Sequence, residues 1–272
     1  AWLGSLSPRA REALATSWAF WARPEQLPPP GEWSTWLVLA GRGWGKTRVG
    51  AEWIRSLDTT VERFALVGAT MADVRDTMVE GESGLCAVYP RRERPRYIAS
   101  KRRVEFASGA FALLYSDEEP DRLRGPQHGA AWCDEIAAWQ RLAKTWANLQ
   151  FGLRLGERPR ALITTTPRSI DFLRELVARG RAGDGAVRLT TGKTSENRGH
   201  LSPEFILRVQ EAYGGTRLGR QELDGEILGP VEGGLVKQEW IRHAEPDGPL
   251  GRVVVGLDPA FSTRHVESGL VV

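Results

Sequence analysis

The sequence predicts an α/β fold in which a mainly parallel sheet is flanked by helices and followed by a small helical lid. Short apolar runs of strand length alternate with helix-compatible segments through residues 1–190. One such run leads through a glycine-rich loop into a helix, which is typical of parallel α/β folds. After residue 190 the pattern changes, and residues 201–225 predict two short helices around Gly214 and Gly215.

The length and composition fit a globular protein. The 272 residues suffice for one α/β domain and a smaller piece, with 41% hydrophobic and 26% charged residues. Apolar stretches are too short to span a bilayer, no signal peptide is evident, and Cys86 and Cys133 make no disulfide framework. We therefore expect a cytoplasmic protein. The four histidines lack metal-ligand spacing, so we expect no zinc site.

The basic residues are mostly arginines. Only five of the 37 are lysines, and the net charge is +3. An arginine-rich surface suits partners that carry phosphate groups.

Residues 7–22 predict the first helix, with Ser7 as its N-cap and Pro8 as its first residue. The loop that follows carries Gln26 and Trp33, just upstream of the glycine-rich loop. Gln26 is placed to hydrogen-bond the edge of an adenine base, and Trp33 to pack against its face. A simple core position for Trp33 fits the sequence equally well.

Residues 41–47 read GRGWGKT, between an apolar run at 36–40 and a helical segment at 48–55. This is the layout of a phosphate-binding P-loop, although Ala40 stands where the pattern has glycine. Glycines let backbone N–H groups curl around phosphate oxygens, and the helix N-terminus adds partial positive charge. Lys46 is expected to reach the β- and γ-phosphates, and the Thr47 hydroxyl to hold Mg²⁺. The candidate nucleotide-binding residues of the loop are Gly41, Arg42, Gly43, Trp44, Gly45, Lys46 and Thr47.

Residues 64–69 predict a buried strand and 71–80 a helix. The segment 91–105 is strongly basic, and it predicts short strands that continue through a turn at Ser108 and Gly109. A cationic hairpin can contact a DNA backbone, but a charged run also fits a solvated face. The candidate DNA contacts are Lys101, Arg102 and Arg103.

A further apolar strand, 130–133, ends in Asp134 and Glu135. Adjacent carboxylates suit nucleotide hydrolysis, because Asp134 can hold the Mg²⁺ shell while Glu135 orients and polarises the attacking water. The strand 160–166 ends in hydroxyls that are expected at the same carboxyl edge of the sheet, where they can sense the γ-phosphate. These are Thr164, Thr165 and Thr166. Threonine is also an ordinary strand residue.

The rest of the chain completes the predicted organisation. Residues 138–150 and 169–179 predict helices, the second ending at Gly180, and 186–190 a last strand. The predicted divisions are a core at 1–190, a helical lid at 191–228, a linker at 229–250 and a new unit at 251–272, whose first strand ends in Asp258.

The chain resembles the large subunit of the DNA-packaging terminase of tailed phages, prophages and gene-transfer agents. The matching segments, in family order, are 26–47, 121–135, 162–168, 213–227 and 253–260. The resemblance implies a RecA-like P-loop ATPase with an additional catalytic glutamate, using ATP and Mg²⁺. It also implies a ring, usually a pentamer, at the portal of an empty capsid, which pumps double-stranded DNA inward. The terminase small subunit is a further implied partner, and no membrane is involved.

By position, the resemblance places Lys46 and Thr47 in the phosphate loop and Arg42 as the additional arginine that terminases have there. It makes Asp134 and Glu135 the metal and catalytic carboxylates, and 164–166 the coupling motif. Arg124 matches the arginine finger proposed to act on the ATP of the neighbouring subunit, a task that suits a permanently charged, planar guanidinium. Arg122 is close enough in sequence to be the finger instead.

The family also has a C-terminal nuclease of RNase H type, and Asp258 matches its first metal-binding aspartate. Cleavage with two metal ions needs several carboxylates, and the others would lie beyond Val272. We therefore expect no nuclease activity from this sequence.

Two other functions share these features. A helicase-like, nucleic-acid-dependent ATPase has the same glycine loop, carboxylate pair and threonines, but it requires a second motor domain in the chain. A nucleotide-binding assembly scaffold is the third alternative. The intact Lys46, Thr47, Asp134 and Glu135 argue against it.

Overall fold

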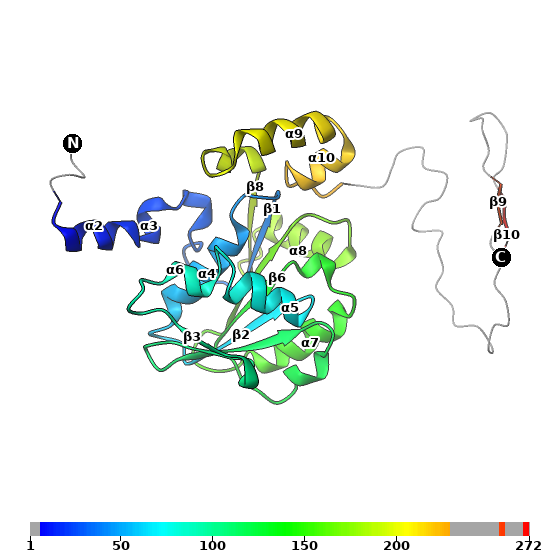
Figure 1. Cartoon of the computed structure of the whole chain (residues 1–272). Coiled ribbons are helices and arrows are strands. Elements are labelled where there is room, and N and C mark those ends of the chain that lie inside the picture. The colour runs from blue at the N-terminus through cyan, green and yellow to red at the C-terminus, as the bar shows by residue number, and fades with distance from the viewer. Residues whose placement is uncertain (1–5, 229–255, 259–268, 272) are drawn as a thin grey trace. The chain divides into compact units, whose positions relative to one another are not determined.

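The computed structural model describes residues 6–228, 256–258 and 269–271. Residue contacts divide the chain into two units, 1–227 and 228–272. The first unit is built on an eight-stranded sheet with the order β3-β4-β5-β2-β6-β7-β1-β8 (Figure 1). In the described part of the second unit, β9 (Gly256–Asp258) pairs antiparallel with β10 (Gly269–Val271).

The sheet of the first unit is mainly parallel, as predicted. Its strands are β1 (Thr35–Ala40), β2 (Arg63–Gly68), β3 (Arg96–Ile98), β4 (Arg103–Glu105), β5 (Phe111–Ser116), β6 (Ala130–Asp134), β7 (Arg160–Thr165) and β8 (Val187–Gly192). From β5 to β8 all neighbouring strands are parallel, whereas β3–β4 and β4–β5 are antiparallel. The strand β7 lies between β1 and β6, so the glycine loop and the carboxylate pair flank its carboxyl end.

The helices pack around this sheet. The α-helices are α2 (Pro8–Ala15), α3 (Trp18–Trp21), α4 (Lys46–Leu57), α5 (Met71–Asp73), α6 (Leu85–Val88), α7 (Leu142–Gly152), α8 (Asp171–Ala182), α9 (Pro203–Tyr213) and α10 (Arg217–Glu222). The 3₁₀-helices are η1 (Pro24–Gln26), η3 (Ala99–Lys101), η4 (Pro120–Leu123), η5 (Ile136–Ala138) and η6 (Thr194–His200), and η2 (Val74–Val79) is a π-helix. None of the helices in the described residues is long and apolar enough to cross a membrane.

Both faces of the sheet are buried. Along β1, Trp36 and Val38 join the cluster that includes Trp53 of α4, whereas Leu37 and Leu39 join the opposite cluster. That opposite cluster also contains residues of α7 and α8. A strand covered on both faces reads as a continuous apolar run rather than an alternating one, which is what the sequence shows at 36–40.

Three predicted helices differ in detail. The predicted helix 7–22 is broken between α2 and α3, because Ser17 is extended at the start of α3. The predicted helix 71–80 is one α-turn followed by the π-helix η2. The helix predicted to end at Gly180 continues to Ala182 and ends at Gly183, whose φ is +69°. Gly180 instead allows close packing, since a Cβ there would lie 2.8 Å from the Leu189 Cβ.

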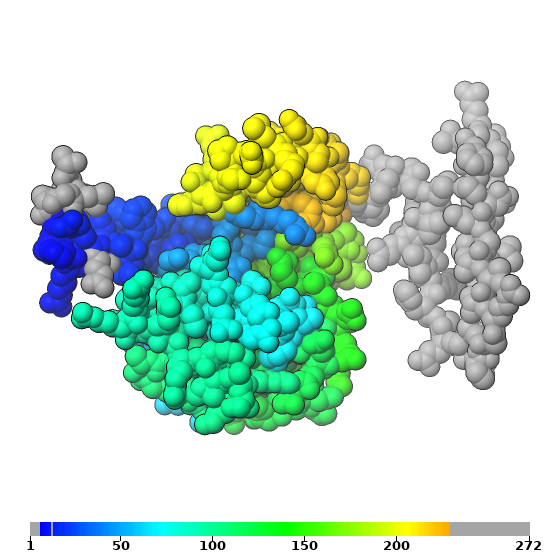
Figure 2. Space-filling model, viewed as in Figure 1, coloured from blue at the N-terminus to red at the C-terminus, as the bar shows by residue number. Residues whose placement is uncertain are grey.

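The two helices predicted in 201–225 are confirmed as α9 and α10, with Gly215 between them at φ +73°. Each has a side-chain N-cap. Ser202 Oγ accepts from Phe205 N at 3.1 Å, and Thr216 Oγ1 accepts from Gly219 N at 3.0 Å. These helices lie over the loops that follow β1 and β8 (Figures 1 and 2). The predicted linker, 229–250, lies outside the described residues.

Candidate active site

The glycine loop connects the carboxyl end of β1 to the first turn of α4. Gly43 and Gly45 have φ values of +71° and +104°, a region that residues with a Cβ rarely adopt. A Cβ on Gly45 would also lie 2.9 Å from Gln26 Nε2. The loop therefore needs glycine at these positions for its own backbone path and for its neighbours.

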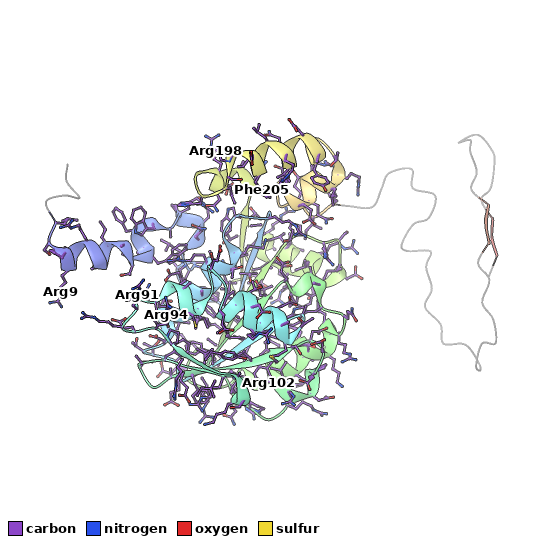
Figure 3. All side chains as sticks on the ribbon, in the orientation of Figure 1. Arg9, Arg91, Arg94, Arg102, Arg198 and Phe205 are labelled. Atoms are coloured by element: carbon purple, nitrogen blue, oxygen red, sulfur yellow. The ribbon has the colours of Figure 1, made fainter. Side chains whose placement is uncertain are left out.

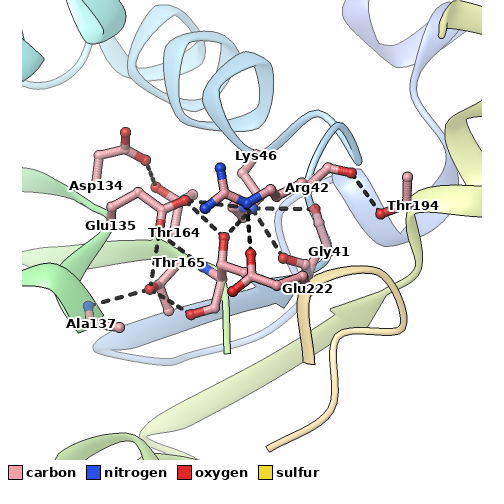
Figure 4. Close-up of polar contacts among 12 residues, drawn as sticks. Gly41, Arg42, Lys46, Asp134, Glu135, Ala137, Thr164, Thr165, Thr194 and Glu222 are labelled. Carbon is pink, nitrogen blue, oxygen red and sulfur yellow. Dashed lines mark hydrogen bonds and ion pairs between the residues drawn. The ribbon is translucent and has the colours of Figure 1, made fainter. Parts of the chain in front are cut away.

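Side chains from distant segments hold the carbonyl groups of this loop. The donors are Arg23 Nη2 (to Trp44 O, 2.7 Å), Gln26 Nε2 (to Trp44 O, 3.3 Å), Asn197 Nδ2 (to Gly43 O, 2.6 Å) and Thr194 Oγ1 (to Arg42 O, 2.6 Å). Sequence reasoning missed Arg23, Asn197 and Thr194, because no local motif marks them. Figure 4 shows the contact from Thr194.

The N–H side of the loop is unoccupied by protein acceptors. Within the described residues, the backbone N–H groups of Gly43, Gly45, Lys46 and Thr47 donate to no protein acceptor. Free N–H groups at the start of a twelve-residue helix attract an anion, through hydrogen bonds and through the helix dipole. The loop therefore presents donors while its carbonyls are satisfied elsewhere, which is the requirement for binding phosphate.

Lys46 is buried beneath the loop, with 7% of its surface exposed. Its Nζ donates to Ala40 O at 3.0 Å, Gly41 O at 3.2 Å and Thr166 Oγ1 at 3.0 Å. Burial lowers the pKa of Lys46, and the carboxylates of Glu135 and Asp134 oppose that shift. The ammonium group is thus held close to the place where phosphates would bind.

Asp134 ends β6 and is buried. Its Oδ1 accepts from Thr164 Oγ1 at 2.5 Å (Figure 4). Thr164 Oγ1 in turn accepts from the indole N–H of Trp132 at 2.8 Å. Burial, reinforced by the charge of Glu135, raises the pKa of Asp134 to about 7. This chain of hydrogen bonds fixes the orientation of the Asp134 carboxyl group.

Glu135 follows in a left-handed backbone conformation, with φ +45°. Its Oε2 accepts from Thr166 N at 3.1 Å, and its Oε1 accepts from Thr166 Oγ1 at 3.1 Å. Oε1 also lies 3.6 Å from Lys46 Nζ. A non-glycine residue in this conformation carries backbone strain, which is characteristic of functional sites. Thr166 therefore links the lysine of the glycine loop to Glu135.

Arg42 is on the exposed side of the loop and pairs with the lid. Its Nε is 2.6 Å from Glu222 Oε2 of α10, and this contact raises the pKa of Arg42. The Arg42 N–H also donates to the Glu222 carbonyl at 2.8 Å. Glu222 is a further residue that sequence reasoning missed.

The expected adenine contacts are corrected in part. Trp33 is 6% exposed and packs in the core against Trp36 and Trp53, with its indole N–H donating to Pro29 O, so its face is not free for a base. Gln26 is buried, and its amide bonds Trp44 O and Arg23 N. In this structure Trp33 therefore packs in the core, and Gln26 holds the glycine loop. The Trp44 side chain is fully buried, so only the backbone of this residue is available to a bound phosphate.

Arg122 and Arg124 lie on the segment of η4 and its C-cap. Arg122 pairs with Glu119 at 3.0 Å, and the Arg124 side chain is 72% exposed, 3.8 Å from Asp121. Neither contacts the glycine loop or the carboxylate pair within the described residues. The segment is fastened to α7, where Asn148 Nδ2 donates to Pro120 O at 2.9 Å.

The arginines that are predicted to contact DNA in the hairpin make ion pairs within the fold, and their DNA contact stays a prediction. Arg102 pairs with Glu119, and Arg103 pairs with Glu105 at 3.2 Å while its guanidinium lies 3.8 Å from the Phe111 ring centre. Glu119 also pairs with Arg122, and Glu105 also pairs with Arg96, so each carboxylate is shared by two arginines. Lys101 remains exposed.

In the second unit, Asp258 is described only as the last residue of β9, where its backbone pairs with Gly269.

The fold and the site together define a class of protein. A glycine loop with free N–H groups, a buried lysine and a carboxylate pair across β7 make a RecA-like P-loop ATPase. Residues 37–243 match the family "Terminase large subunit, T4likevirus-type, N-terminal", and the chain therefore belongs to this family of DNA-packaging ATPases.

Solved structures share the fold at low sequence identity. The chain is similar to the large terminase ATPase domain of Thermus phage P74-26, with a TM-score of 0.56 and 14% identity over 82% of this chain and 98% of that chain. It is similar to the ADP complex of a large terminase from a thermophilic bacteriophage, with a TM-score of 0.59 and 16% identity over 93% of this chain. For the large terminase of bacteriophage HK97 the TM-score is 0.55, with 13% identity over 82% of this chain.

The present chain is shorter than the complete terminases. It spans 61% of the terminase chain in the ADP complex and 50% of the HK97 chain. No curated protein matches it.

Proposed function

We propose that the site hydrolyses ATP with Mg²⁺ and that hydrolysis drives double-stranded DNA into a capsid. The observation that carries this proposal is the link from Lys46 through Thr166 to Glu135. It lies beside four N–H donors that meet no acceptor in the described part of the chain. It brings a phosphate-binding group and a group that can activate water to one point. Membership of the terminase family supplies the DNA-packaging setting.

The donor set fits Mg²⁺. The Thr47 hydroxyl is in the first turn of α4, and Asp134 ends β6, so both offer the oxygen ligands that Mg²⁺ prefers. No cluster of three or more acidic, histidine or cysteine residues suited to a metal occurs in the described ranges. A metal held by two side chains also needs the substrate phosphates and water. When bound, Mg²⁺ neutralises charge on the β- and γ-phosphate oxygens.

The residues of the site then have separate tasks. The N–H groups of the glycine loop bind phosphate oxygens, and Lys46 exchanges its carbonyl and Thr166 partners for the β- and γ-phosphates. Glu135 orients a water for attack on the γ-phosphorus and accepts its proton, while the bond to the β-phosphate oxygen breaks to give ADP and phosphate. The threonines 164–166 couple this site to the rest of the fold.

We propose further that the site is completed by a second copy of the chain, in a ring that is usually a pentamer. Arg124, or Arg122 on the same segment, would supply the arginine finger to the neighbour. Beside Arg124, the Phe151 side chain is 77% exposed, and with Arg154 these residues line a hollow of about 320 Å³. An exposed aromatic side chain beside an exposed arginine on a fixed segment suits an interface between protein subunits.

The remaining partners follow from the family. The portal protein, the capsid and the terminase small subunit are the proposed protein partners, and the bacterial host cytoplasm is the proposed compartment.

The test is ATP turnover per chain as a function of protein concentration, with and without duplex DNA. Specific activity that rises with concentration, and that is lost in Arg124→Ala, supports sites completed between subunits. Activity that stays flat with concentration contradicts the ring. No ATP turnover at any concentration contradicts the catalytic assignment itself.

A further inference from the structure

Residues 90–95, with the sequence PRRERP, form an exposed basic loop ahead of β3. Arg91, Arg92 and Arg94 are all exposed, and within the described residues none of them makes an ion pair. They differ in this from Arg102 and Arg103 of the neighbouring hairpin. The loop projects from the surface, and Arg91 and Arg94 lie on the same side as Arg9 of α2 (Figures 2 and 3).

The basic loop is held in shape locally. Prolines stand at both ends and fix φ there, and Glu93 N donates to Pro90 O at 2.9 Å to close a turn. Pro95 is buried, and its carbonyl accepts from Cys86 Sγ at 3.8 Å. The arginines are therefore presented on a turn whose conformational entropy is already reduced.

The base of the basic loop is attached to α4, the helix that begins at Lys46. Tyr89 Oη donates to Asp58 Oδ2 at 2.7 Å, and Arg55 Nη1 donates to Val88 O at 3.0 Å. The Arg55 guanidinium also lies 5.5 Å from the Tyr89 ring centre and pairs with the buried Glu52 at 3.2 Å. The two residues that enter the loop are thus bonded to α4 and to its C-cap, Asp58, and the other end of this helix follows the glycine loop.

Uncompensated guanidinium groups on a fixed, projecting turn suit a ligand with repeated phosphates. We propose that residues 90–95 bind the phosphate backbone of duplex DNA and that α4 joins this contact to the glycine loop. This inference rests on the proposed function for its ligand, but it assigns the DNA contact to Arg91, Arg92 and Arg94. The contact is independent of base sequence, because guanidinium–phosphate contacts read no base edge.

The test uses the full chain and a fluorescein-labelled duplex, with affinity measured by anisotropy across a series of salt concentrations. The variant R91A/R94A removes two arginines of the basic loop. The matched control R181A/R208A removes two exposed arginines from α8 and α9, so the net charge changes equally. We expect R91A/R94A to flatten the slope of log affinity against log salt by about two units and to weaken binding about tenfold or more. The control keeps the wild-type slope.

A third variant, Tyr89→Phe, keeps every arginine but loses the bond to Asp58. We expect its salt slope to equal that of wild type, while the stimulation of ATP turnover by duplex DNA falls at least twofold. Thermal unfolding of each variant checks that the fold is retained.

The outcomes separate this inference from the ATPase assignment. If R91A/R94A and R181A/R208A change the slope equally, or if neither does, the basic loop is not the DNA contact. If wild type turns over ATP but binds no duplex, the DNA contact is overturned and the catalytic assignment stands. If wild type binds duplex through this loop but does not turn over ATP, the DNA contact stands and the catalytic assignment is overturned. If R91A/R94A loses affinity for an acidic protein surface and not for duplex, the ligand assigned here is wrong.

Discussion

Glu222 contacts Arg42 twice, through its carboxylate at 2.6 Å from Arg42 Nε and through its carbonyl, which accepts the Arg42 N–H at 2.8 Å. These two contacts join the end of α10 to the glycine loop (Figure 4). We expect the carboxylate to compete with a bound triphosphate for the same guanidinium, because both are anions that an arginine can bind.

Removing this competition is expected to strengthen ATP binding. We expect Glu222→Gln to lower the KM for ATP up to about fivefold, since an exposed ion pair is worth up to ~1 kcal/mol. Arg42→Ala is expected to raise KM. Glu226→Gln is the matched control, because it removes one carboxylate whose ion pair, with Arg220, spans 4.0 Å and does not involve Arg42. Steady-state kinetics checks all three, and a KM that rises in Glu222→Gln contradicts the competition.

Glu135→Gln is expected to reduce kcat about 10²–10⁴-fold, the usual contribution of a positioned general base. Nucleotide affinity is expected to persist, because the amide keeps the size of the side chain and the glycine loop is untouched. Glu118→Gln, at an exposed carboxylate, controls for the loss of charge. Steady-state turnover and nucleotide binding by calorimetry measure both quantities. Unchanged turnover in Glu135→Gln would assign catalysis to another group.

The hydroxyl of Thr166 forms hydrogen bonds with both Lys46 and Glu135. Substitutions that remove either the hydroxyl or the methyl group distinguish these hydrogen bonds from the packing of the side chain. We expect Thr166→Val to lower kcat about tenfold, in keeping with one lost hydrogen bond to charged groups, while Thr166→Ser retains most activity. The two variants are compared at equal folded fraction. Equal activity in both would contradict the role assigned to the hydroxyl, because only Thr166→Ser retains it.

Gly50 of α4 faces Trp132, and a Cβ at this position would lie 2.0 Å from Trp132 Cε2. Gly50→Ala therefore overpacks the core and is expected to cost about 1–3 kcal/mol, despite the better helix propensity of alanine. It also moves the indole that bonds Thr164, and through Thr164 the carboxyl group of Asp134. Gly199→Ala, with open space around its Cβ, is the control. Denaturant unfolding and ATP turnover measure the two effects, and equal stability of both variants would contradict the overpacking.

His128 is fully buried beside Tyr115, and neither of its ring nitrogens reaches a hydrogen-bond partner among the described residues. Burial lowers the pKa of His128 to about 4, with a smaller contribution from Arg63. The backbone of Phe64 opposes the shift without forming a full hydrogen bond. The unfolded chain, with a pKa of about 6.5, therefore binds more protons between these two values.

Stability from this residue is fully present above pH 6.5 and falls as the pH approaches 4, by up to about 3 kcal/mol. Denaturant unfolding at several pH values should show this loss in wild type. His128→Leu lacks the titrating ring, so its stability curve is expected to be flatter over the same range. Parallel curves for the two proteins would assign the acid sensitivity to other groups.

The sequence predicts the central strands and the reacting groups because each is marked locally. The glycine loop, the Asp134–Glu135 pair and 164–166 are each read from a few adjacent residues, and parallel strands bring their carboxyl ends to one edge. The support of the loop has no such local mark. Arg42 and Glu222 are 180 residues apart, and the partners Thr194 and Asn197 are each about as distant from the carbonyls they bond.

The ion pairs of the basic hairpin also have no local mark in the sequence. Arg102 pairs with Glu119, which is 17 residues away and follows β5, the strand that pairs with β4. Charge counting along the sequence cannot see such a partner. A count of charges along the sequence treats the arginines of residues 90–95 in the same way as Arg102 and Arg103, which make ion pairs.

The hydrogen bonds to the carbonyls of the glycine loop also bear on the rates of nucleotide exchange. A loop whose carbonyls are already bonded has little ordering left to do when the ligand arrives. The rate of nucleotide association is then limited by diffusion to the site rather than by rearrangement of the loop. Substitutions at Arg23, Thr194 or Asn197 are therefore expected to change mainly the rate of nucleotide dissociation. We therefore expect the time for which ADP stays bound to depend in part on the side chains that hold the carbonyls of the loop.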